Sequence, residues 1–271
     1  MPEGDTVFLT GRRLDEALAG GVLVRAELRH PRLVGARLTG LTVLGVRTVG
    51  KHLLTRFGDG TSLHSHLKMD GAWHLYRAGD RWRGRTHDIR VLLATDTWTA
   101  VGFRLHDLAL LRTDQESDLV GHLGPDLMAE DWNDELAGTA VTRLAADGDR
   151  EIADVLSDQR VMAGVGNLYK AEVCFLLGVT PWTPVAGLSP EQVTKAVTLS
   201  QKLLRRNAWH PEQSTTGELR PGRQHWVYQR AGKPCLRCGT PIRVAEQGSW
   251  VPARHTWFCP KCQAGPRPGS M

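Results

Sequence analysis

Apolar positions in the first hundred residues follow two spacings. Between Thr6 and Leu18 they recur every three or four residues, as on one face of a helix, and the pair Gly20-Gly21 marks its end. Short segments rich in β-branched and other apolar residues follow, two of them joined by the turn Gly58-Asp59-Gly60, and these are typical of strands and hairpins. The predicted strands cover residues 41–49, 52–57, 61–66, 72–76, 89–94 and 98–103. Many short strands at close spacing favour a sandwich or barrel.

The spacing changes to a helical period beyond residues 112–132. Helices are predicted at residues 135–144, 151–156, 168–177 and 191–204, and a glycine-bearing turn, VMAGVGN at 161–167, leads into the third. The pattern predicts an α+β multidomain chain, with a β-sandwich domain and a flanking helix followed by a helical domain. The expected boundaries are 1–112 for the sandwich domain, 113–132 for a linker, 133–225 for the helical domain, 226–263 for a small cysteine-bearing module and 264–271 for a tail.

The composition is that of an ordinary globular protein. Of 271 residues, 41% are hydrophobic and 23% are charged, which excludes a wholly disordered or collagen-like chain. No apolar run approaches the roughly 18 residues of a membrane span, and no basic segment followed by an apolar one marks a secretory signal. We therefore expect a cytoplasmic protein.

Positive charge is concentrated in one region. The chain carries 34 Lys and Arg against 29 Asp and Glu, a formal charge of +5. Residues 202–243 alone hold nine Lys and Arg against two glutamates, so the rest of the chain is slightly acidic. A solvated helix face is the simplest interpretation of such a run, but a local excess is also what a docking surface for a polyanion requires.

Four cysteines form the strongest motif. Cys235 and Cys238 make one CxxC pair, twenty residues follow, and Cys259 and Cys262 make the second. Each pair can bend around a metal ion while the intervening segment forms a hairpin, which predicts a four-thiolate zinc finger. A disulfide pair or coincidence is the alternative, but a cytosolic chain keeps its thiols reduced. Since four thiolates leave no open coordination position, the expected cofactor is one structural Zn²⁺ per chain.

Other candidate residues are ambiguous when each is taken singly. Cys174 lies in an apolar helical segment and is predicted to be a core residue. Arg254, in SWVPARHTWFC, suits a bidentate phosphate contact, although an exposed surface arginine is the commoner case. The stretch GVGN can bind phosphate through its backbone N–H groups and the positive end of the next helix, or Asn167 can be an N-cap. Lys51, which follows Gly50 in VGKHLL, is by itself most simply solvated.

The start of the chain, MPEGDTV, raises a chemical alternative to an idle terminus. A small second residue usually allows removal of Met1, and Pro2 would then present a secondary amine. An α-amino group has a pKa of about 8, below that of a lysine, so part of it is neutral and nucleophilic near pH 7. An exposed and chemically idle terminus is the usual case, and Pro2 alone does not decide between the two.

These pieces occur in one order along the chain. The order is PEG, then Gly50-Lys51 before an apolar strand, SHLKMDGAW, DQRVMAGVGNLYKAE, and finally GKPCLRCGTPI with ARHTWFCPKCQ. From Pro2 to Gln263 it resembles the formamidopyrimidine-DNA glycosylase and endonuclease VIII family of base-excision repair enzymes. The resemblance implies a β-sandwich domain, a helical domain with a helix-two-turn-helix, a zinc finger, and duplex DNA as the partner.

The resemblance also implies roles for matched positions. Pro2 corresponds to the nucleophile, and Glu3 corresponds to the catalytic acid/base beside it. Lys51 corresponds to the β-hairpin lysine that positions a phosphate and assists catalysis. Asn167 and Arg254 correspond to the phosphate ligands of the helix-turn and of the finger.

Further features bear on the residue that fills the gap in the DNA and on the branch of the family. Met69 stands where the family carries an apolar wedge that fills the gap left by a flipped base, with a buried hairpin methionine as the alternative. The guanine-lesion branch places an Arg and a Phe on a second loop, and residues 105–111 hold neither at the matching positions. Together with PEG rather than PEL at the start, this favours the endonuclease VIII branch and oxidised pyrimidines. Thr6, Lys68 and Asp70 depart from the residues that the family commonly carries.

The resulting hypothesis is a bifunctional DNA glycosylase and abasic-site lyase that forms an iminium at Pro2 and nicks the strand by β- or β,δ-elimination. Its expected partner is double-stranded DNA with oxidised bases or abasic sites, which it would bind as a monomer, associated with the nucleoid. The main alternative is a non-catalytic zinc-finger protein that binds damaged or abasic DNA. A terminal proline acting as a general base, as in tautomerases, would leave the finger unexplained.

Overall fold

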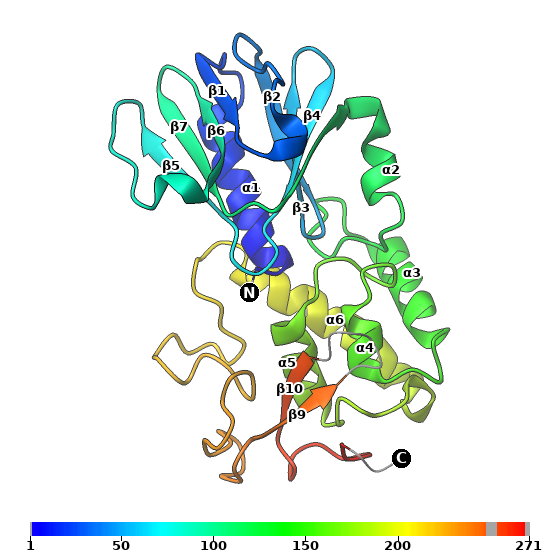
Figure 1. Cartoon of the computed structure of the whole chain (residues 1–271). Coiled ribbons are helices and arrows are strands. Elements are labelled where there is room, and N and C mark those ends of the chain that lie inside the picture. The colour runs from blue at the N-terminus through cyan, green and yellow to red at the C-terminus, as the bar shows by residue number, and fades with distance from the viewer. Residues whose placement is uncertain (1, 248–253, 269–271) are drawn as a thin grey trace. The chain divides into compact units, whose positions relative to one another are not determined.

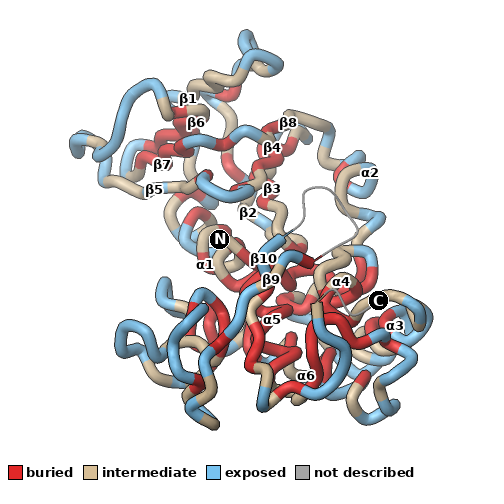
Figure 2. Tube along the Cα trace, turned by 60° about the horizontal axis from the view of Figure 1, so that its bottom comes forward, coloured by how far each residue is buried: buried red, intermediate tan, exposed pale blue. Residues whose placement is uncertain are grey.

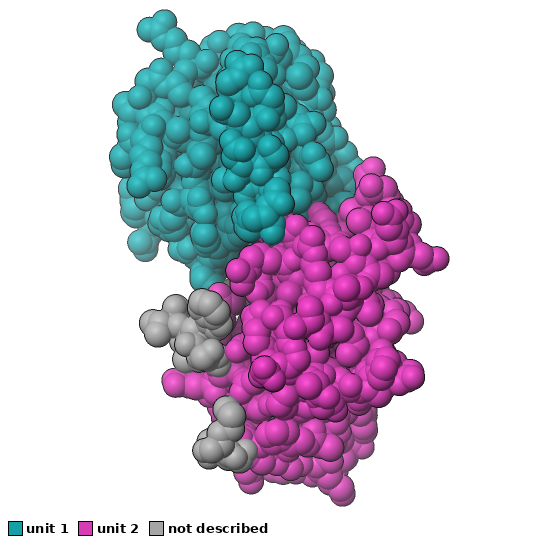
Figure 3. Space-filling model, turned by 90° about the vertical axis from the view of Figure 1, so that its right-hand side faces the viewer, with its two compact units in different colours: residues 1–122 teal, residues 123–271 magenta. Residues whose placement is uncertain are grey.

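The computed structural model describes residues 2–247 and 254–268. The chain divides into two units, Met1–His122 and Leu123–Met271, which Figure 3 shows in different colours. Each unit has its own helices, strands and buried residues. The first is named unit 1 and the second unit 2.

Unit 1 begins with helix α1, Gly4–Leu18 (Figure 1). The apolar stripe of this helix is buried. Val7, Leu14 and Leu18 are 1%, 2% and 1% exposed. The helix starts two residues earlier than predicted and ends before Gly20, whose φ of +78° strains any residue with a side chain. The helix predicted from the apolar spacing is therefore confirmed.

Two four-stranded antiparallel sheets make up most of the remainder of unit 1. One has the strand order β1-β6-β7-β5, and the other has the order β2-β3-β4-β8. The predicted sandwich is confirmed, and four predicted strands have the same bounds in the structure. The strands are β1 Arg25–Leu28, β2 Val43–Val49, β3 His52–Phe57, β4 Thr61–His66, β5 Ala72–Arg77, β6 Ile89–Ala94, β7 Trp98–Phe103 and β8 Asp107–Arg112.

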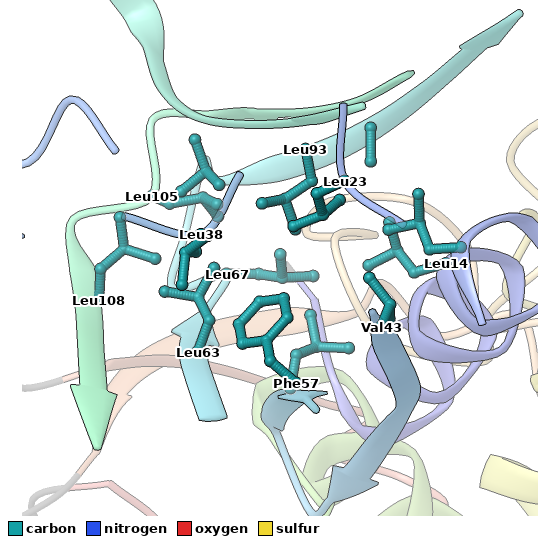
Figure 4. Packing of buried hydrophobic residues seen from close by; sticks show 14 of the residues in the cluster. Leu14, Leu23, Leu38, Val43, Phe57, Leu63, Leu67, Leu93, Leu105 and Leu108 are labelled. Carbon is teal, nitrogen blue, oxygen red and sulfur yellow. The ribbon is translucent and has the colours of Figure 1, made fainter. Parts of the chain in front are cut away.

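One hydrophobic core lies between the two sheets and one face of α1 (Figure 4). Phe57 and Leu63 enter it from one sheet and Leu93 from the other, and each is at most 1% exposed. Burying one such side chain contributes about 1.5–3 kcal/mol. The core therefore holds together the two sheets whose turns carry Lys51 and Met69.

The sequence analysis did not predict two of the strands of unit 1, β1 and β8. β1 reads RAEL, has no fully buried residue and lies at a sheet edge beside β6. β8 reads DLALLR and pairs with β4 in register from Thr61↔Arg112 to His66↔Asp107. Neither has the alternation or the β-branched content that distinguishes a strand, so pairing with a neighbour decides the conformation.

Short helical segments connect and follow these strands. Unit 1 contains η1 Pro31–Leu33, η2 Thr86–Asp88, η3 Thr113–Gln115 and α2 Glu116–Val120. The carboxylate of Glu116 accepts hydrogen bonds from Arg56 at 2.6 and 3.0 Å and from the hydroxyl of Ser62 at 2.6 Å. These contacts attach α2 to β3 and β4.

Four α-helices are described in unit 2, close to their predicted positions. They are α3 Asp134–Ala145, α4 Ile152–Ser157, α5 Asn167–Leu177 and α6 Pro190–Asn207, and η4 Val185–Gly187 precedes α6. Asn133 caps α3 by accepting from the N–H groups of Glu135 and Leu136, each at 3.0 Å. Ser189 and Gln192 form a capping box at the start of α6.

Helix α5 is buried on all sides over its first nine residues, from Asn167 to Phe175, and packs against α4, α6 and β10 (Figure 2). Cys174 is fully buried, as predicted, and burial raises the pKa of its thiol to about 12. The helix ends at Gly178, whose φ of +78° is the left-handed conformation typical of a helix terminus. Apolar spacing did not predict this degree of burial, because α5 also contains Lys170 and Glu172.

The cysteine-bearing module contains a small hairpin. Strands β9 Arg243–Gln247 and β10 Arg254–Phe258 pair antiparallel. The hairpin predicted between the two CxxC pairs is confirmed, and its turn, residues 248–253, lies outside the described residues. Among the described residues, no helix combines the length and the apolar character of a membrane span.

Candidate functional site

Pro2 and Glu3 lead directly into α1. Glu3 is the N-cap residue of the helix, but its side chain makes no capping hydrogen bond and is 0% exposed. Asp5, in the first turn, is 1% exposed, whereas Pro2 is half-buried. A buried carboxylate thus adjoins the residue whose nitrogen is the candidate nucleophile, as a proton-transfer group requires.

The position of α1 is set by close contact with β2. A Cβ on Gly11 would lie 2.3 Å from Cγ2 of Thr48, so only glycine permits this approach. The carboxylate of Asp15 accepts a hydrogen bond from the N–H of Val46 at 2.7 Å. The helix that starts at the chain's first residues is therefore fixed against the β2–β3 hairpin.

Lys51 occupies the two-residue turn of that hairpin. Val49 pairs with His52 across the turn, and Gly50 has a φ of +57°, as a tight hairpin turn requires. The sequence places Lys51 directly before the strand predicted at residues 52–57, and in the structure the lysine lies in the turn and is half-buried. The pairing of β2 with β3 thus fixes the backbone position of Lys51.

Three histidines that the sequence analysis did not single out lie on one face of β3 and β4. Nδ1 of His52 lies 2.9 Å from Nε2 of His64. The ring of His66 packs edge-on against that of His52, with 5.1 Å between centroids, and Asp107 of β8 is paired with His66. The alternation His-Ser-His within a predicted strand was the available signal, since it places both histidines on one face.

The histidine cluster is neutral near pH 7. Burial, with a contribution from neighbouring His64, lowers the pKa of His52 to about 3. Burial and the charge of Lys68 lower the pKa of His66 to about 4. The neutral rings can therefore hydrogen-bond to one another at neutral pH, and the positive charge beside them comes from Lys68 and Lys51.

Met69 is exposed in the turn between β4 and β5. Its exposed fraction of 69% shows that the buried alternative is wrong. Lys68 and Asp70 on either side are exposed as well, so the turn presents one apolar side chain between two charged ones. A flexible exposed thioether of this kind can enter a base step.

The GVGN turn leads into α5 with a glycine, not Asn167, at the N-cap position. Gly166 is the N-cap residue and Asn167 is the first residue of the helix, so the N-cap alternative for Asn167 is wrong. Gln159 closes the turn, because its Nε2 donates to the carbonyl of Val165 at 2.9 Å and its Oε1 accepts from the N–H of Gly164 at 3.0 Å. The N–H of Gly164 is thus engaged within the chain and is not available to a phosphate in this structure.

Asn167 is joined to the finger hairpin. Its Nδ2 donates to the carbonyl oxygen of His255 at 3.1 Å, whereas its Oδ1 is buried without a hydrogen-bond partner among the described residues. His255 follows Arg254, the exposed first residue of β10. This contact brings together the two segments that the resemblance assigns to phosphate binding, although they lie 88 residues apart.

The four cysteines of the finger converge on one point. Their Sγ atoms all lie within 4.8 Å of one another, with 3.9 Å between Cys235 and Cys262 and 3.5 Å between Cys238 and Cys259. Tetrahedral Zn–S bonds of about 2.3 Å place sulfurs about 3.8 Å apart, so the residues fit zinc. The N–H groups of Arg237 and Cys262 donate to the sulfurs of Cys235 and Cys259, each at 3.4 Å, which supports thiolate ligands.

The zinc site is part of the core of unit 2. Cys235 and Cys259 belong to a buried cluster with Phe175 of α5 and Ile242. The guanidinium of Arg237 lies 4.4 Å from the ring centroid of Phe175. One structural zinc, saturated by four thiolates, thus fastens the finger to the helix that begins at Asn167.

A buried glutamate that sequence reasoning missed organises the segment before the finger. Glu172 of α5 is 0% exposed, and its carboxylate accepts hydrogen bonds from the N–H groups of Trp226, Val227 and Tyr228, each at 2.8 Å. The hydroxyl of Thr215 donates to the same carboxylate. A buried charge needs such partners, but the sequence alone does not show that this position is buried.

The candidate residues are divided between the two units. Unit 1 contains Pro2, Glu3, Lys51 and Met69, whereas unit 2 contains Asn167, Arg254 and the four cysteines. The structure joins Asn167 to the finger within unit 2 and packs α1 against the strands beside Lys51 within unit 1. The roles of the non-cysteine residues in DNA chemistry stay predictions.

Three sequence models cover most of the chain, and two of them describe domains of one family. The model of the formamidopyrimidine-DNA glycosylase N-terminal domain matches residues 1–124, and that of the formamidopyrimidine-DNA glycosylase H2TH domain matches residues 123–217. The model of the zinc finger found in FPG and IleRS matches residues 232–265. The cysteine module is therefore a zinc finger of the type that this family carries.

Relatives match the chain over nearly its full length. A probable endonuclease 8 2 of Streptomyces coelicolor is 53% identical over 269 residues, which are 99% of this chain and 96% of the relative. The DNA-(apurinic or apyrimidinic site) lyase Nei2 of Mycolicibacterium smegmatis is 44% identical over 263 residues, 97% of this chain and 99% of the relative. The structure of Lactococcus lactis Fpg with an abasic site containing DNA aligns with a TM-score of 0.81 and 25% identity, over 97% of this chain and 100% of that one. The chain therefore belongs to the formamidopyrimidine-DNA glycosylase and endonuclease VIII family, in its endonuclease VIII-like branch.

Proposed function

We propose that this protein is a bifunctional DNA glycosylase and abasic-site lyase of base-excision repair, with Pro2 as nucleophile and oxidised pyrimidines as the preferred bases. The observation that carries the proposal is the Pro2-Glu3 pair at the start of α1, with the glutamate fully buried, in a chain of this family. The names of two relatives, an endonuclease 8 and an abasic-site lyase, support the same chemistry.

The first step uses the amine of Pro2 once Met1 has been removed. Its nitrogen attacks C1′ of the damaged nucleotide, the glycosidic bond breaks, and the base leaves with a proton. Opening of the sugar ring at O4′ then gives an iminium between the proline nitrogen and C1′. A secondary amine is suited to this step because the resulting iminium keeps its positive charge at any pH.

Strand cleavage follows from the iminium, which withdraws electrons from the sugar. Loss of a proton from C2′ allows the C3′–O3′ bond to break and releases the 3′ phosphate, and a second elimination can release the 5′ phosphate. Glu3 is the proposed proton carrier for these steps, because it adjoins the nucleophile and is removed from solvent. Lys51 is proposed to hold a phosphate near the reacting sugar from the β2–β3 turn.

Unit 2 is proposed to bind the DNA backbone. Asn167 and Arg254 would contact phosphates, and the hydrogen bond from Asn167 to His255 supports a common role because it couples the two segments. The structural zinc contributes by holding the finger against α5, and no chemical step is assigned to it. The basic residues between 202 and 243 would add sequence-independent affinity.

A base within a duplex must leave the stack before Pro2 can reach its sugar. We propose that Met69 fills the gap, since it is exposed in the β4–β5 turn. The absence of the guanine-branch arginine and phenylalanine from residues 105–111 supports oxidised pyrimidines as substrates. The protein would act as a monomer, associated with the nucleoid while it is bound to DNA.

Borohydride trapping tests the proposal. Protein shown by intact mass to lack Met1 is incubated with an abasic-site duplex, and reduction of the iminium is expected to give a covalent protein–DNA adduct. Pro2→Ala should give at least about a hundredfold less adduct while it still binds the duplex, because a primary amine replaces the positioned secondary amine. No adduct from the Met1-free wild type would contradict the lyase and leave a non-catalytic damage-binding protein.

The base preference has its own test. Duplexes that differ only in carrying thymine glycol, dihydrouracil or 8-oxoguanine are compared by their rates of cleavage. Faster cleavage of the two pyrimidines is expected, and faster cleavage of 8-oxoguanine would overturn the pyrimidine assignment but not the trapping result.

A further inference from the structure

Two turns of unit 1 are fastened to each other on either side of Met69. The first turn, residues 67–71, joins β4 to β5, and the second, residues 104–106, joins β7 to β8. Lys68 in the first and Arg104 in the second have φ values of +50° and +48°. Residues with side chains adopt this conformation only where surrounding contacts hold it.

The contacts between the turns are ionic. Nζ of Lys68 lies 2.8 Å from Oδ2 of Asp107, the first residue of β8. On the other side of Met69, Nε of Arg104 donates to the carbonyl oxygen of Asp70 at 3.1 Å and lies 3.4 Å from its Oδ2. Both neighbours of Met69 are thus paired with the second turn. Lys68 pairs with Asp107, directly after that turn, and Asp70 pairs with Arg104 within it.

Arg104 is itself held in place, so it can hold Asp70. Its N–H donates to the carbonyl of Asp88 at 2.7 Å, and its guanidinium lies 4.0 Å from the Asp88 carboxylate. The first turn is closed by Gly71, whose N–H donates to the carbonyl of Leu67 at 2.9 Å and whose Cβ, if present, would lie 2.6 Å from that oxygen. A closed turn with both flanks paired leaves Met69 as the exposed apolar tip.

We propose that the pairs Lys68–Asp107 and Asp70–Arg104 form a clasp that shapes the Met69 turn before DNA binds, which makes Lys68, Asp70 and Arg104 positioning residues for the wedge. The inference rests on the proposed function, because it requires that Met69 enters the DNA. A turn already in its binding shape loses less conformational freedom on insertion, so insertion is faster and more favourable. The clasp also gives a role to Lys68 and Asp70, two of the three positions at which this chain departs from the common family pattern.

The test measures insertion separately from cleavage. A duplex with tetrahydrofuran in place of the abasic sugar cannot react with Pro2, and 2-aminopurine opposite it brightens when a wedge unstacks it. Stopped-flow mixing with wild-type protein is expected to give a fluorescence rise that Met69→Ala lacks. Asp70→Asn and Arg104→Gln are each expected to slow the rise about fivefold, the factor that corresponds to losing one exposed ion pair of the upper usual strength.

The two variants change the net charge in opposite directions, which separates a clasp from simple attraction to DNA. Attraction alone predicts that Asp70→Asn speeds insertion and Arg104→Gln slows it, whereas a clasp predicts that both slow it. The double variant should be no slower than Arg104→Gln alone, because that variant has already lost the ion pair that Asp70→Asn removes. Asp70→Glu should restore much of the rate.

Controls use an equivalent pair elsewhere in unit 1. Arg112, the last residue of β8, forms an exposed ion pair with Asp114 at 2.9 Å, and Asp114→Asn should insert like the wild type. If a variant at Asp70 is not folded, as judged by its thermal transition, Lys68→Gln tests the other half of the clasp with the same expected slowing.

Two results would overturn the inference in distinguishable ways. Opposite effects of Asp70→Asn and Arg104→Gln, or wild-type rates in both, would overturn the clasp while wild-type trapping on an abasic site upholds the proposed function. Absence of both trapping and insertion in the wild type would overturn the proposed function and the clasp with it.

Discussion

Glu3 and Arg254 show how differently the individual candidate residues are placed. Glu3 is fully buried next to Pro2, while Arg254 is exposed at the first position of β10. Burial suits a group that transfers protons to a sugar enclosed by the protein, because competing water is excluded. Exposure suits a guanidinium that must reach a phosphate of a large partner. Each residue type thus lies in an environment that matches its proposed role.

Arg254 carries a prediction about binding. Arg254→Ala is expected to weaken duplex affinity about equally for different DNA sequences and to reduce the slope of log Kd against log salt by about one, because one phosphate contact releases about one counterion. Fluorescence anisotropy between 50 and 200 mM salt measures both quantities.

A matched arginine provides the control for this experiment. Arg112→Ala removes the same charge from an exposed ion pair in unit 1 and should leave the slope unchanged. An unchanged slope in Arg254→Ala would remove Arg254 from the phosphate contacts.

At the scale of elements, β3 and β4 together carry a cluster of three histidines. Their paired register brings three histidines into contact on the sheet face that also bears Asp107. Partial burial acts to raise the pKa of Asp107, but the hydrogen bond and charge of Lys68 outweigh it, so the pKa lies below its ordinary value. A charged Asp107 beside neutral histidines therefore leaves Lys68 as its ionic partner, and the histidine face adjoins the clasp.

The histidine cluster predicts how stability depends on pH. Burial lowers the pKa of His52 to about 3, from an ordinary value of 6.5. Between these values the unfolded state binds a proton that the folded state does not, so stability is lost as the pH falls below 6.5 towards 3. Between pH 6.5 and 5, the free energy of unfolding of His52→Gln should fall less steeply than that of the wild type, by about 1 kcal/mol per pH unit.

Urea unfolding followed by circular dichroism at several pH values measures this difference in slope. The same comparison at pH 8, where histidines are neutral in both states, gives the separate cost of the lost contact with His64. Equal slopes for the two proteins would show that His52 takes up its proton as readily in the folded state as in the unfolded one.

For the whole molecule, the division into two units assigns the proposed chemistry to one and the metal to the other. Unit 1 contains Pro2 and Glu3, and unit 2 contains the zinc finger and Asn167. The finger is a small hairpin whose buried cluster includes two of the cysteines, so its folding depends on the metal. A function that needs both units must therefore be sensitive to zinc, although zinc takes no part in the chemistry.

Removing zinc is expected to abolish cleavage of an abasic duplex while α1 and the sandwich stay folded. The apparent binding free energy of a structural zinc is about 10–16 kcal/mol, more than a module of this size gains from its own core, so the metal-free finger unfolds. Cleavage is measured after chelation, with metal content verified by mass spectrometry.

Cysteine variants make the prediction specific to the finger. Cys238→Ala should lose both the zinc and the activity, whereas Cys174→Ala, which changes a buried residue of α5 outside the metal site, should retain one zinc per chain. Full cleavage activity in verified zinc-free protein would show that the finger is dispensable.

The elements that could be predicted are those whose own residues carry the signal. β3 and β4 were predicted with their observed bounds, because two short strand-like segments flank the Gly58-Asp59-Gly60 turn, an arrangement typical of a hairpin. β1 and β8 were missed, since both are edge strands whose conformation depends on pairing with β6 and β4. Tertiary pairing is not visible in a four- or six-residue segment taken alone.

The candidate site divides in the same way. The four cysteines could be predicted because a metal imposes their spacing, and their convergence confirms the zinc site. The sequence left open whether Met69 was buried, and the structure decided it. Sequence reasoning missed Glu172, because an isolated polar residue has no recognisable spacing. It also missed His64, although the His-Ser-His spacing within a predicted strand was a signal.

The sequence by itself determined the family, the sandwich, the principal helices, the zinc ligands and the type of chemistry that Pro2 and Glu3 can perform. Those conclusions depend on residue identity and on spacing within short segments. Only the tertiary structure decided that Asn167 reaches His255, that Glu172 binds the segment before the finger, and that the charged residues on either side of Met69 form ion pairs. Each of these contacts joins residues more than thirty positions apart, and such contacts form only when packing of the core brings their elements together.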